Sequence, residues 1–306
     1  GKHVVTANKA LLAEHGAELY SAAKERGVDL LFEGSVAGGI PIIRVLKEGL
    51  AANRIHYICG ILNGTCNYIL TKMTEGNGDF DEVLKEAQHM GYAEADPTLD
   101  IEAYDTAHKL AILLALSQGT HVSLSDIYTE GITKITSLDI QFARELGYRI
   151  KLLGIIRNTG DEVEARVHPT MISEGHILSS VNGAFNALQI VGDSVGSILV
   201  CGLGAGMMPT ASAVVGDVME LARNILKGVC QRVPELAFQS QYVGYKKIRP
   251  IEHLACAYYF RFTALDRPGV LSKITGILGE HDISLASVIQ KGRRAGQGVP
   301  VVCLLY

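Results

Sequence analysis

The sequence lacks tryptophan, lacks any pair of cysteines in CxxC spacing and has no excess of charge of one sign. Its 28 lysines and arginines nearly balance 32 acidic residues and are scattered along the 306-residue chain. A nucleic-acid-binding protein needs a basic face, so this pattern argues against a nucleic-acid partner. Uninterrupted apolar runs reach only seven residues, as in LAILLAL at 110–116, whereas a membrane-spanning helix needs about 20. No membrane partner is therefore expected.

The six cysteines and ten histidines do not form a recognisable metal site. Structural zinc needs clustered ligands, and neither HxH nor HExxH spacing occurs in the chain. Most cysteines lie in apolar runs such as ILVCG and VVCLL, which is typical of buried reduced thiols in a cytoplasmic protein. No signal peptide is visible, so a cytoplasmic location is expected.

Apolar periodicity and turn signals predict an α/β and α+β protein with several domains. The opening reads as strand, helix, strand up to Val36, which is a βαβ unit with parallel strands. Helical patterns dominate residues 42–120, and short strands over 148–200 predict an antiparallel or mixed sheet packed on helices. A glycine loop then leads into a long helix. Residues 231–254 have weak periodicity, and 256–306 read as strand, helix, strand, strand.

The stretch EADPTLDIEAYDTAHK, residues 94–109, predicts one helix that begins at Asp96 as its cap, with Pro97 in the first turn. Past that turn the helix is apolar almost all round, which is typical of a buried helix. Yet it carries Asp105 and Lys109 four residues apart. An exposed pair of this kind contributes only a few tenths of a kcal/mol, and a buried pair seldom repays its desolvation. Burial instead brings an amine toward the range useful for proton transfer, so a structural ion pair and a functional site both stay open.

Further acidic residues crowd the start of the same helix. Helix capping and solvation explain Asp96 and Glu102 well. Glu94 and Asp100 are instead candidates to bind the ammonium group of a ligand.

The stretch ILNGTCNYIL at 61–70 combines a turn signal with a helix start. Thr65 is expected to cap that helix, and the alternative is a substrate site, because a helix N-terminus attracts a carboxylate. Lys9, in VVTANKALL, follows a parallel strand, and open α/β sheets bind ligands outside such strand ends. A solvated lysine in the first turn of a helix is the plain alternative.

Two glycine-rich stretches, FEGSVAGGIPII at 32–43 and CGLGAGMMPTASAV at 201–214, are candidate binding loops. The first is a strand-to-helix turn that does not match the GxxxxGK[ST] phosphate loop. Its alternative role is to hold a cation through turn carbonyls beside the Glu33 carboxylate. In the second, Gly202 and Gly204 fit the first two positions of GxGxxG but a methionine fills the third, so the dinucleotide fingerprint fails. A glycine loop that opens a helix is still able to approach a ligand closely.

Taken together, these stretches resemble homoserine dehydrogenase. The matching blocks agree in order and spacing, and the likeness covers nearly the whole chain. The last segment, at 262–288, resembles an ACT domain, an amino-acid-sensing module. The other matching blocks are KHVVTANKALL (2–12), FEGSVAGGIPII (32–43), GILNGTCNYIL (60–70), GYAEADPTLDIEAYDTAHK (91–109) and GLGAGMMPTASAVVGD (202–217).

The resemblance implies NAD(P)-dependent interconversion of L-homoserine and L-aspartate 4-semialdehyde, a step in threonine and methionine biosynthesis. It implies that Lys109 is the general acid/base and that Asp105 orients this lysine and the substrate hydroxyl. By the same resemblance Glu94 holds the substrate ammonium group, while Asp100 and Thr65 line the pocket.

The resemblance further implies sites for a cofactor, a cation and an effector. The residues implied to border NAD(P) are Lys9, Gly91, Gly204 and Gly206. Those implied to hold a structural monovalent cation, Na⁺ or K⁺, are Glu33 and the carbonyls of Val36, Gly38 and Ile40. Those that match the effector turn of an ACT domain, with threonine as the expected effector, are Asp266, Pro268 and Gly269.

The resemblance also divides the chain and implies a homodimer or homotetramer. The expected parts are 1–33 as the C-terminal part of a Rossmann-type nucleotide-binding domain, 34–201 as an α+β substrate-binding and dimerisation domain with a mixed sheet, 202–230 as the glycine loop and helix that return to the nucleotide-binding domain, 231–254 as a linker, and 255–306 as a partial ferredoxin-like ACT domain. Both ends look cut, so a fragment of a longer protein is expected. The pyrophosphate-binding loop and the residue that selects NAD or NADP are expected before Gly1.

A second hypothesis is a catalytically silent amino-acid sensor, which keeps the ACT segment and uses the rest as a scaffold. An enzyme fold that is inactive in truncated form lies between the two hypotheses. The ACT segment itself has the alternative of a dimerising module without a ligand. The Asp105–Lys109 pair favours the enzyme, because a sensor has no need for a buried amine.

Overall fold

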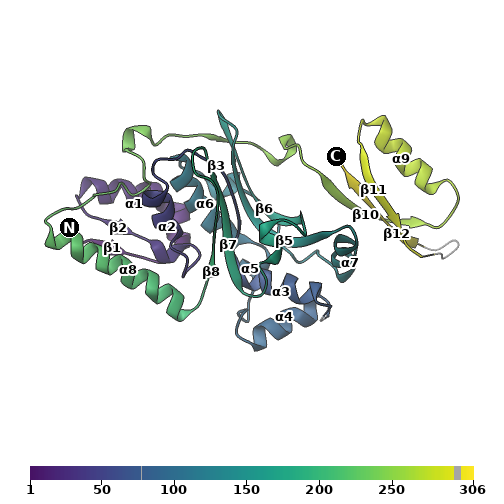
Figure 1. The fold of residues 1–306 in the computed structure, drawn as a ribbon, viewed down its shortest axis with the longest axis horizontal. Coiled ribbons are helices and arrows are strands. Elements are labelled where there is room, and N and C mark those ends of the chain that lie inside the picture. The colour runs from purple at the N-terminus through teal and green to yellow at the C-terminus, as the bar shows by residue number, and fades with distance from the viewer. Residues whose placement is uncertain (77, 293–297) are drawn as a thin grey trace. The chain divides into compact units, whose positions relative to one another are not determined.

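The computed structural model describes residues 1–76, 78–292 and 298–306, and this part of the chain forms two units. The first unit is Gly1–Ile251 and the second is Glu252–Tyr306 (Figure 1). The first contains a short parallel βαβ unit and a mixed sheet with its helices, and the second is a small sheet with a helix. Within the described ranges no helix combines the length and apolar character needed to cross a membrane.

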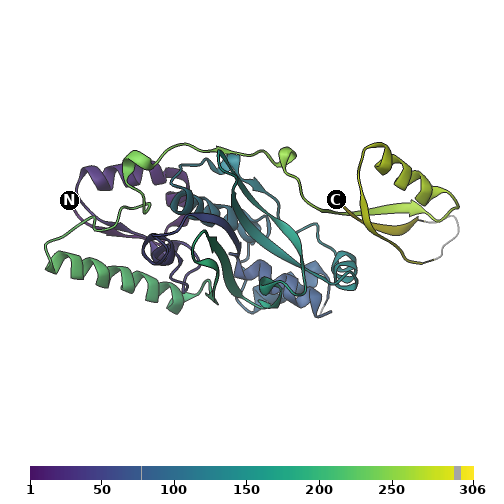
Figure 2. The same cartoon turned by 45° about the horizontal axis from the view of Figure 1, so that its top comes forward.

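The βαβ unit predicted at the start of the chain is confirmed. β1 (Val4–Val5) and β2 (Leu30–Leu31) are parallel, and α1 (Lys9–Glu25) is the crossover between them. Each strand is two residues long, which is shorter than the sequence pattern indicates. Figures 1 and 2 show α8 (Met207–Leu226) on the side of this strand pair opposite α1. The helix after the glycine loop therefore returns to the βαβ unit.

The mixed sheet expected from residues 148–200 is confirmed and extends beyond that range. Its strands lie in the order β4, β6, β5, β3, β7, β8, and β9 also pairs with β6. β4 and β9 run parallel to β6, whereas the other neighbouring strands are antiparallel. The strand bounds are β3 (Ile55–Ile61), β4 (Tyr128–Thr129), β5 (Tyr148–Asn158), β6 (Glu162–Ser173), β7 (Phe185–Gly192), β8 (Gly196–Leu203) and β9 (Lys247–Ile248).

Helix α6 (Tyr104–Gln118) is buried against one face of this sheet, as its apolar pattern predicts. Successive strand residues point to opposite faces of a sheet, and Ile58, Ile156 and Leu188 belong to the same core cluster as the helix. A second cluster, which includes Cys59, Ile61, Leu153 and Ile155, lies on the other face. The other helices of this part are α2 (Ile42–Arg44), α3 (Gly64–Thr74), α4 (Phe80–His89), α5 (Thr98–Ile101) and α7 (Ser137–Glu145).

The prediction of one continuous helix from Asp96 is wrong, because the chain breaks into α5 and α6. Ala103 between them has a left-handed backbone, with φ of 67°. In a continuous helix the Ile101 carbonyl would accept a hydrogen bond from residue 105. Here it accepts the Ile132 amide at 2.8 Å instead. Asp96 is not the cap of α6, and its carboxylate accepts hydrogen bonds from the amide and hydroxyl of Thr98.

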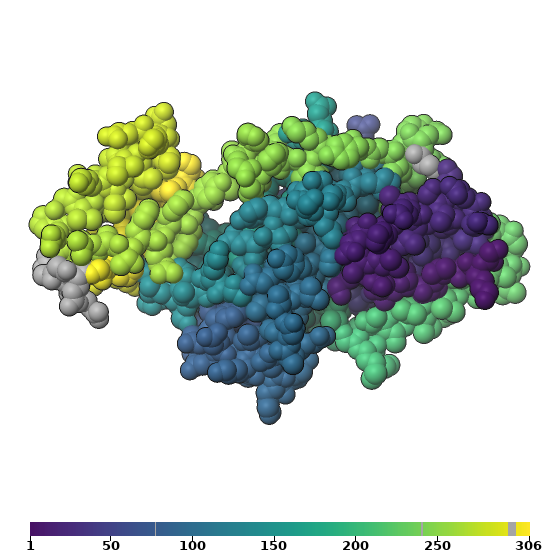
Figure 3. Space-filling view, turned by 180° about the vertical axis from the view of Figure 1, so that it is seen from behind, coloured from purple at the N-terminus to yellow at the C-terminus, as the bar shows by residue number. Residues whose placement is uncertain are grey.

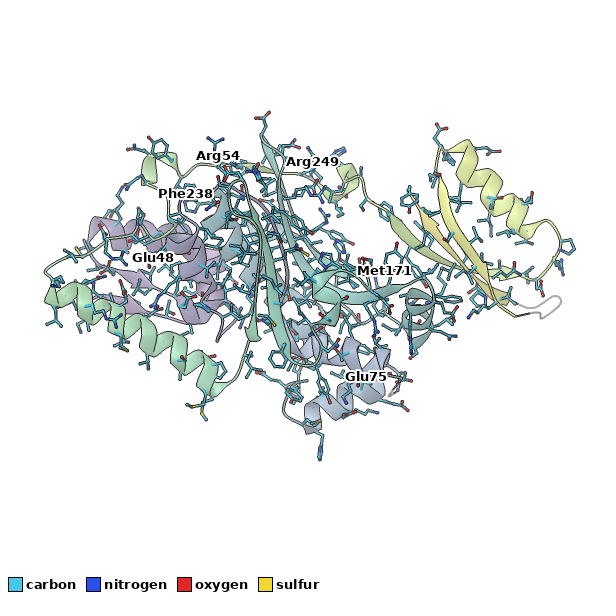
Figure 4. The ribbon with its side chains drawn as sticks, in the orientation of Figure 1. Glu48, Arg54, Glu75, Met171, Phe238 and Arg249 are labelled. Atoms are coloured by element: carbon cyan, nitrogen blue, oxygen red, sulfur yellow. The ribbon has the colours of Figure 1, made fainter. Side chains whose placement is uncertain are left out.

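The segment expected as a linker lies mostly on the first unit. The Gln231 amide donates to the Asp29 carboxylate at 2.6 Å, and Leu236 belongs to the main core cluster. Figure 4 labels Phe238, whose ring packs on Gly119 at the end of α6, and Arg249, which pairs with Glu162 of β6 at 3.0 Å. The same segment runs along the surface of the first unit in the space-filling view (Figure 3). These contacts place the division between the units after Ile251.

The second unit has the predicted order of strand, helix, strand, strand. Its sheet order is β10, β12, β11, with both pairs antiparallel. Ala264, Val301 and Cys303 form a small core against which Val270 and Ile274 of the helix pack. The bounds are β10 (Tyr258–Leu265), α9 (Val270–Glu280), β11 (Leu285–Gln290) and β12 (Gly298–Leu305).

Candidate active site

Asp105 and Lys109 lie one helical turn apart on α6, and both are buried. The Lys109 Nζ donates to the Asp105 carboxylate at 2.7 Å and to the Leu62 carbonyl at 2.7 Å. Each side chain is only 10% exposed. An ammonium group has three N–H donors, and within the described residues only these two contacts use them. The third donor position is therefore available to a ligand.

Lys9, at the start of α1, adds a second ammonium group to the same carboxylate. Its Nζ lies 3.2 Å from Asp105 Oδ1, whereas Lys109 binds Oδ2. The Lys9 side chain is 40% exposed, so it lies at the open side of the pair. The sequence placed Lys9 near a ligand but gave no sign of its contact with Asp105, because α1 and α6 meet only in the fold.

Asn63, which by sequence reads only as part of a turn, joins the site to α3. Its side-chain NH₂ donates to Asp100 at 2.6 Å and to Asp105 at 2.9 Å. Its side-chain oxygen accepts the Cys66 amide at 2.8 Å and caps α3. The residue is 4% exposed, and one amide therefore fixes two carboxylates and a helix start together.

The prediction that Thr65 caps α3 is wrong, because Asn63 has that role. The Thr65 hydroxyl instead donates to the Tyr92 carbonyl at 2.6 Å. This bond ties the first turn of α3 to the loop after α4, in which Gly91 and Glu94 lie. Thr65 is only partly buried, so it borders the open part of the site.

The two carboxylates that bind Asn63 differ in their protonation behaviour. Burial alone raises the pKa of Asp105, but the charge and hydrogen bond of Lys109, helped by Lys9 and Asn63, leave that pKa below its ordinary value. Burial raises the pKa of Asp100, and the nearby Asp105 charge adds to the rise, which the Asn63 bond only partly offsets. Asp105 is therefore fixed as the anionic partner of the buried amine.

Two residues expected at the site lie in the neighbouring loop without direct contact to the pair. Glu94 is exposed, and among the described residues its carboxylate makes no hydrogen bond or ion pair. Its backbone carbonyl accepts a bond from Gln88 at 3.1 Å. Gly91 follows α4 with φ of 77°, a left-handed conformation that favours glycine, and its amide donates to the Gln88 carbonyl.

The glycine loop between β8 and α8 packs tightly on the end of β7. A Cβ at Gly204 would lie 2.0 Å from the side chain of Asn186, which is 1% exposed. The Gly204 carbonyl in turn leaves no room for a Cβ at Gly38. The Gly39 amide donates to the Leu203 carbonyl at 3.0 Å. The loop after β2 and the loop after β8 are thus in direct contact.

The start of α8 fits the binding of an anionic or carbonyl oxygen of a dinucleotide. Gly206 is its N-cap with φ of 115° and provides no side-chain cap. Met207 and Met208 in its first turn are exposed, and no side chain caps their amide groups. Gly206 is thus the cofactor candidate with the clearest physical reason.

Replacing Gly204 with alanine is expected to lower the free energy of unfolding by about 1–3 kcal/mol, the usual cost of overpacking a core. The added methyl group would overlap Asn186, and urea unfolding measures the loss. Gly49→Ala is the matched control, because no atom outside its own helix and chain neighbours lies within 4 Å of its Cβ position. Equal midpoints for Gly204→Ala and the wild type would contradict the close packing of this loop.

In the candidate cation loop after β2, the Glu33 carboxylate already has hydrogen-bond partners in the protein. The two Glu33 carboxylate oxygens accept the amides of Ile43 and Arg44 at 2.8 and 3.0 Å. Burial raises the pKa of Glu33 to about 7, which these two bonds oppose. The Ile40 carbonyl accepts the Ile42 amide at 2.7 Å but keeps a second lone pair. A cation here would bind backbone oxygen.

The effector turn expected in the second unit lies between β10 and α9. Gly269 is the N-cap of α9 with φ of 87°, a conformation that glycine adopts without strain. Asp266 and Pro268 precede it in the same turn. The three residues are therefore together at the start of a helix.

A parallel βαβ unit joined to a mixed sheet, with an acid and an amine buried on α6, suits a dehydrogenase, an oxidoreductase that acts on an alcohol, and the similar proteins identify that class. The model of the homoserine dehydrogenase family matches residues 41–219, and that of the ACT domain matches 258–305. The chain belongs to the homoserine dehydrogenase family and carries an ACT domain.

Proteins that are similar to this chain over most of its length are homoserine dehydrogenases. Homoserine dehydrogenase of Neisseria gonorrhoeae is 52% identical over 95% of this chain and 67% of that protein. A crystal structure of a homoserine dehydrogenase from Thiobacillus denitrificans is 50% identical and superposes with a TM-score of 0.94, over 100% of this chain and 70% of that one. A hyperthermophilic archaeal homoserine dehydrogenase in complex with NADPH is 30% identical, with a TM-score of 0.62 over 72% of this chain and 64% of that one.

Proposed function

We propose that the site catalyses the NAD(P)-dependent interconversion of L-homoserine and L-aspartate 4-semialdehyde, a step of threonine and methionine biosynthesis. The observation that carries the proposal is the buried Lys109 amine, held by Asp105 and the Leu62 carbonyl with one donor position open. Family membership supports the same reaction. A sensor without catalysis gives no reason for the desolvation cost of this pair.

In the oxidative direction the Lys109 amine accepts the proton of the substrate hydroxyl, and in the reductive direction its ammonium returns that proton to the aldehyde oxygen. The bound nicotinamide supplies the chemistry of hydride exchange at the substrate carbon that bears this oxygen. Asp105 stabilises the ammonium form and fixes Nζ in place. Burial excludes water, so the proton passes between the lysine and the substrate rather than to solvent.

The amino-acid part of the substrate is proposed to lie toward α3 and the loop after α4. Glu94 binds the substrate ammonium group, and Asp100 and Thr65 line the pocket. The exposed Glu94 carboxylate and the bond between Thr65 and the Tyr92 carbonyl support this placement. Asp100 is linked to the pair through Asn63.

The cofactor is proposed to lie along Lys9, Gly91, Gly204 and Gly206. The contact of Lys9 with Asp105 and the open start of α8 support it, as does the archaeal relative in complex with NADPH. We assign residues 1–33 and 202–230 to the nucleotide-binding domain, 34–201 to the substrate and dimerisation domain, and 255–306 to the regulatory domain.

The remaining assignments follow the family resemblance. A monovalent cation, Na⁺ or K⁺, binds the carbonyls of Val36, Gly38 and Ile40 and that of Glu33, whose carboxylate is already bonded. Threonine binds the turn of the ACT domain. The protein is a cytoplasmic homodimer or homotetramer. The effector residues are Asp266, Pro268 and Gly269.

The substrate assignment is tested by NADPH formation in a protein of the relatives' full length that carries this chain. L-Homoserine is expected to turn over, whereas 4-hydroxybutanoate, which lacks the ammonium group, is expected to react far more slowly. Glu94→Gln is expected to raise KM for L-homoserine by about 10-fold or more, since a hydrogen bond to a charged group contributes about 1.5–3 kcal/mol. An equal rate with both alcohols would contradict the assignment, and threonine binding without turnover would favour the sensor.

A further inference from the structure

A second buried lysine, Lys151 of β5, lies on the sheet face opposite α6 and has no role in the proton transfer described above. It is 3% exposed. Its Nζ donates to the Val181 carbonyl at 2.6 Å and to the side-chain oxygens of Asn67 and Asn182 at 3.0 and 3.2 Å. All three N–H donors of the ammonium group are thus used by neutral oxygens.

No carboxylate among the described residues pairs with Lys151, in contrast to Lys109. Burial lowers the pKa of Lys151 to about 8, and the Arg149 charge on the same strand adds to this. A buried charge without a counter-ion costs free energy. Stability is therefore a poor reason for a lysine at this position, and its contacts indicate another.

The oxygens around Lys151 belong to two segments that are bonded to each other. Asn67 of α3 donates through its side chain to the carbonyls of Val181 and Phe185 at 3.1 Å each. The Gly183 amide donates to the Thr71 hydroxyl of α3 at 3.1 Å. Residues 181–185 and α3 thus form one bonded layer at the end of the sheet, and Lys151 lies at its centre.

This layer reaches the active site through a single helical turn. The backbone amide of Asn67 donates to the backbone carbonyl of Asn63 at 3.2 Å. Asn63 holds Asp105 and Asp100 through its side chain. Ala184 also packs on the first turn of α3, since a Cβ at Gly64 would lie 2.8 Å from the Ala184 carbonyl. A shift of Asn67 therefore moves the residue that orients Asp105.

We propose that Lys151 is a positioning residue of the active site, whose ammonium group fixes residues 181–185 and the first turns of α3 and so sets Asn63 against Asp105. It touches neither substrate nor cofactor. The expected loss of kcat rests on the proposed function, whereas the expected loosening of residues 181–185 and α3 does not.

The test compares Lys151→Met with Arg149→Met, a control on the same strand whose side chain is 35% exposed. Lys151→Met is expected to lower kcat by about 10-fold or more, because a misplacement of about 1 Å at a catalytic group costs up to about 10²-fold. KM for the cofactor is expected to change less than kcat, since the three groups that bind the Lys151 Nζ belong to Asn67, Val181 and Asn182 and to none of the cofactor candidates. Arg149→Met is expected to keep the wild-type kcat.

Hydrogen exchange gives a readout that does not depend on turnover. Lys151→Met is expected to raise the exchange of amides in residues 64–71 and 181–185 and to leave α1 and α8 unchanged. Exchange that rises everywhere, or nowhere, overturns the proposal. If these segments loosen while the wild type fails to oxidise L-homoserine, the proposed function fails and the positioning role stands. Asn182→Ala, which removes one partly buried contact, is expected to give a milder change of the same kind.

A double-mutant cycle tests the route through Asn67. The effects of Lys151→Met and Asn67→Leu on kcat are expected to be non-additive, because both break the same bond. Fully additive effects overturn the route.

The wild type is also expected to gain stability relative to Lys151→Met as pH rises from about 8 to 10. In this range the unfolded lysine, with its ordinary pKa of 10.5, binds more protons than the folded one.

Discussion

Replacing Lys109 with alanine is expected to lower kcat for L-homoserine oxidation by about 10²–10⁴-fold, the usual contribution of a general acid/base. The Nζ is 2.7 Å from both Asp105 and the Leu62 carbonyl, so no other described amine occupies that position. Lys9 is 3.2 Å from the other oxygen of Asp105 and does not replace it. Steady-state NADPH formation, in a protein of the relatives' length that carries this chain, measures the loss.

The matched control is Lys134→Ala, which removes an exposed lysine outside the site. It is expected to keep the wild-type kcat and KM. Retention of more than about a tenth of the wild-type kcat in Lys109→Ala would show that the lysine is not the acid/base, because that loss is below the range for such a group.

Replacing Asp105 with alanine is expected to lower the free energy of unfolding by about 3–5 kcal/mol, the usual cost of leaving one charge of a buried pair alone. The Lys109 ammonium would keep only the Leu62 carbonyl, and Asn63 would lose one acceptor. Urea unfolding measures the change. Asp126→Ala, at an exposed position, is the control and is expected to unfold at the wild-type midpoint.

A second variant separates the charge effect from simple loss of packing. In a Lys109→Met background, Asp105→Ala is expected to cost far less, because no buried ammonium is left without a partner. Equal costs in both backgrounds would show that the pair is not coupled.

The Asp105 carboxylate has a lowered pKa in the folded protein. Its contribution to the free energy of unfolding is therefore present above its ordinary pKa of 3.8 and is lost on further acidification.

The buried pair was predictable because its signal is local. Helix periodicity places Asp105 and Lys109 on one arc of α6, and the apolar surroundings indicate burial. The 2.7 Å contact between the two side chains confirms the first expectation, and the 10% exposure of each confirms the second. The βαβ unit and the mixed sheet were likewise read from patterns within short windows.

The site residues whose roles could not be predicted from the sequence act through contacts between distant segments. Asn63 reads as part of a turn, and only the folded chain brings its side-chain amide to Asp105, 42 residues further on. The contact of Lys9 with the same carboxylate depends on α1 crossing α6. The break at Ala103 has a similar cause, because the amide that takes the Ile101 carbonyl comes from Ile132. Local propensity holds no information about such partners.

The most direct test of the account is chemical rescue of Lys109→Ala. Removal of the side chain leaves space beside Asp105 and the Leu62 carbonyl, which are the two groups that bind the native ammonium. Added methylamine is expected to raise kcat of Lys109→Ala in proportion to its concentration and to have no effect on Lys134→Ala. A wild-type rate in Lys109→Ala without any added amine would contradict proton transfer by this lysine.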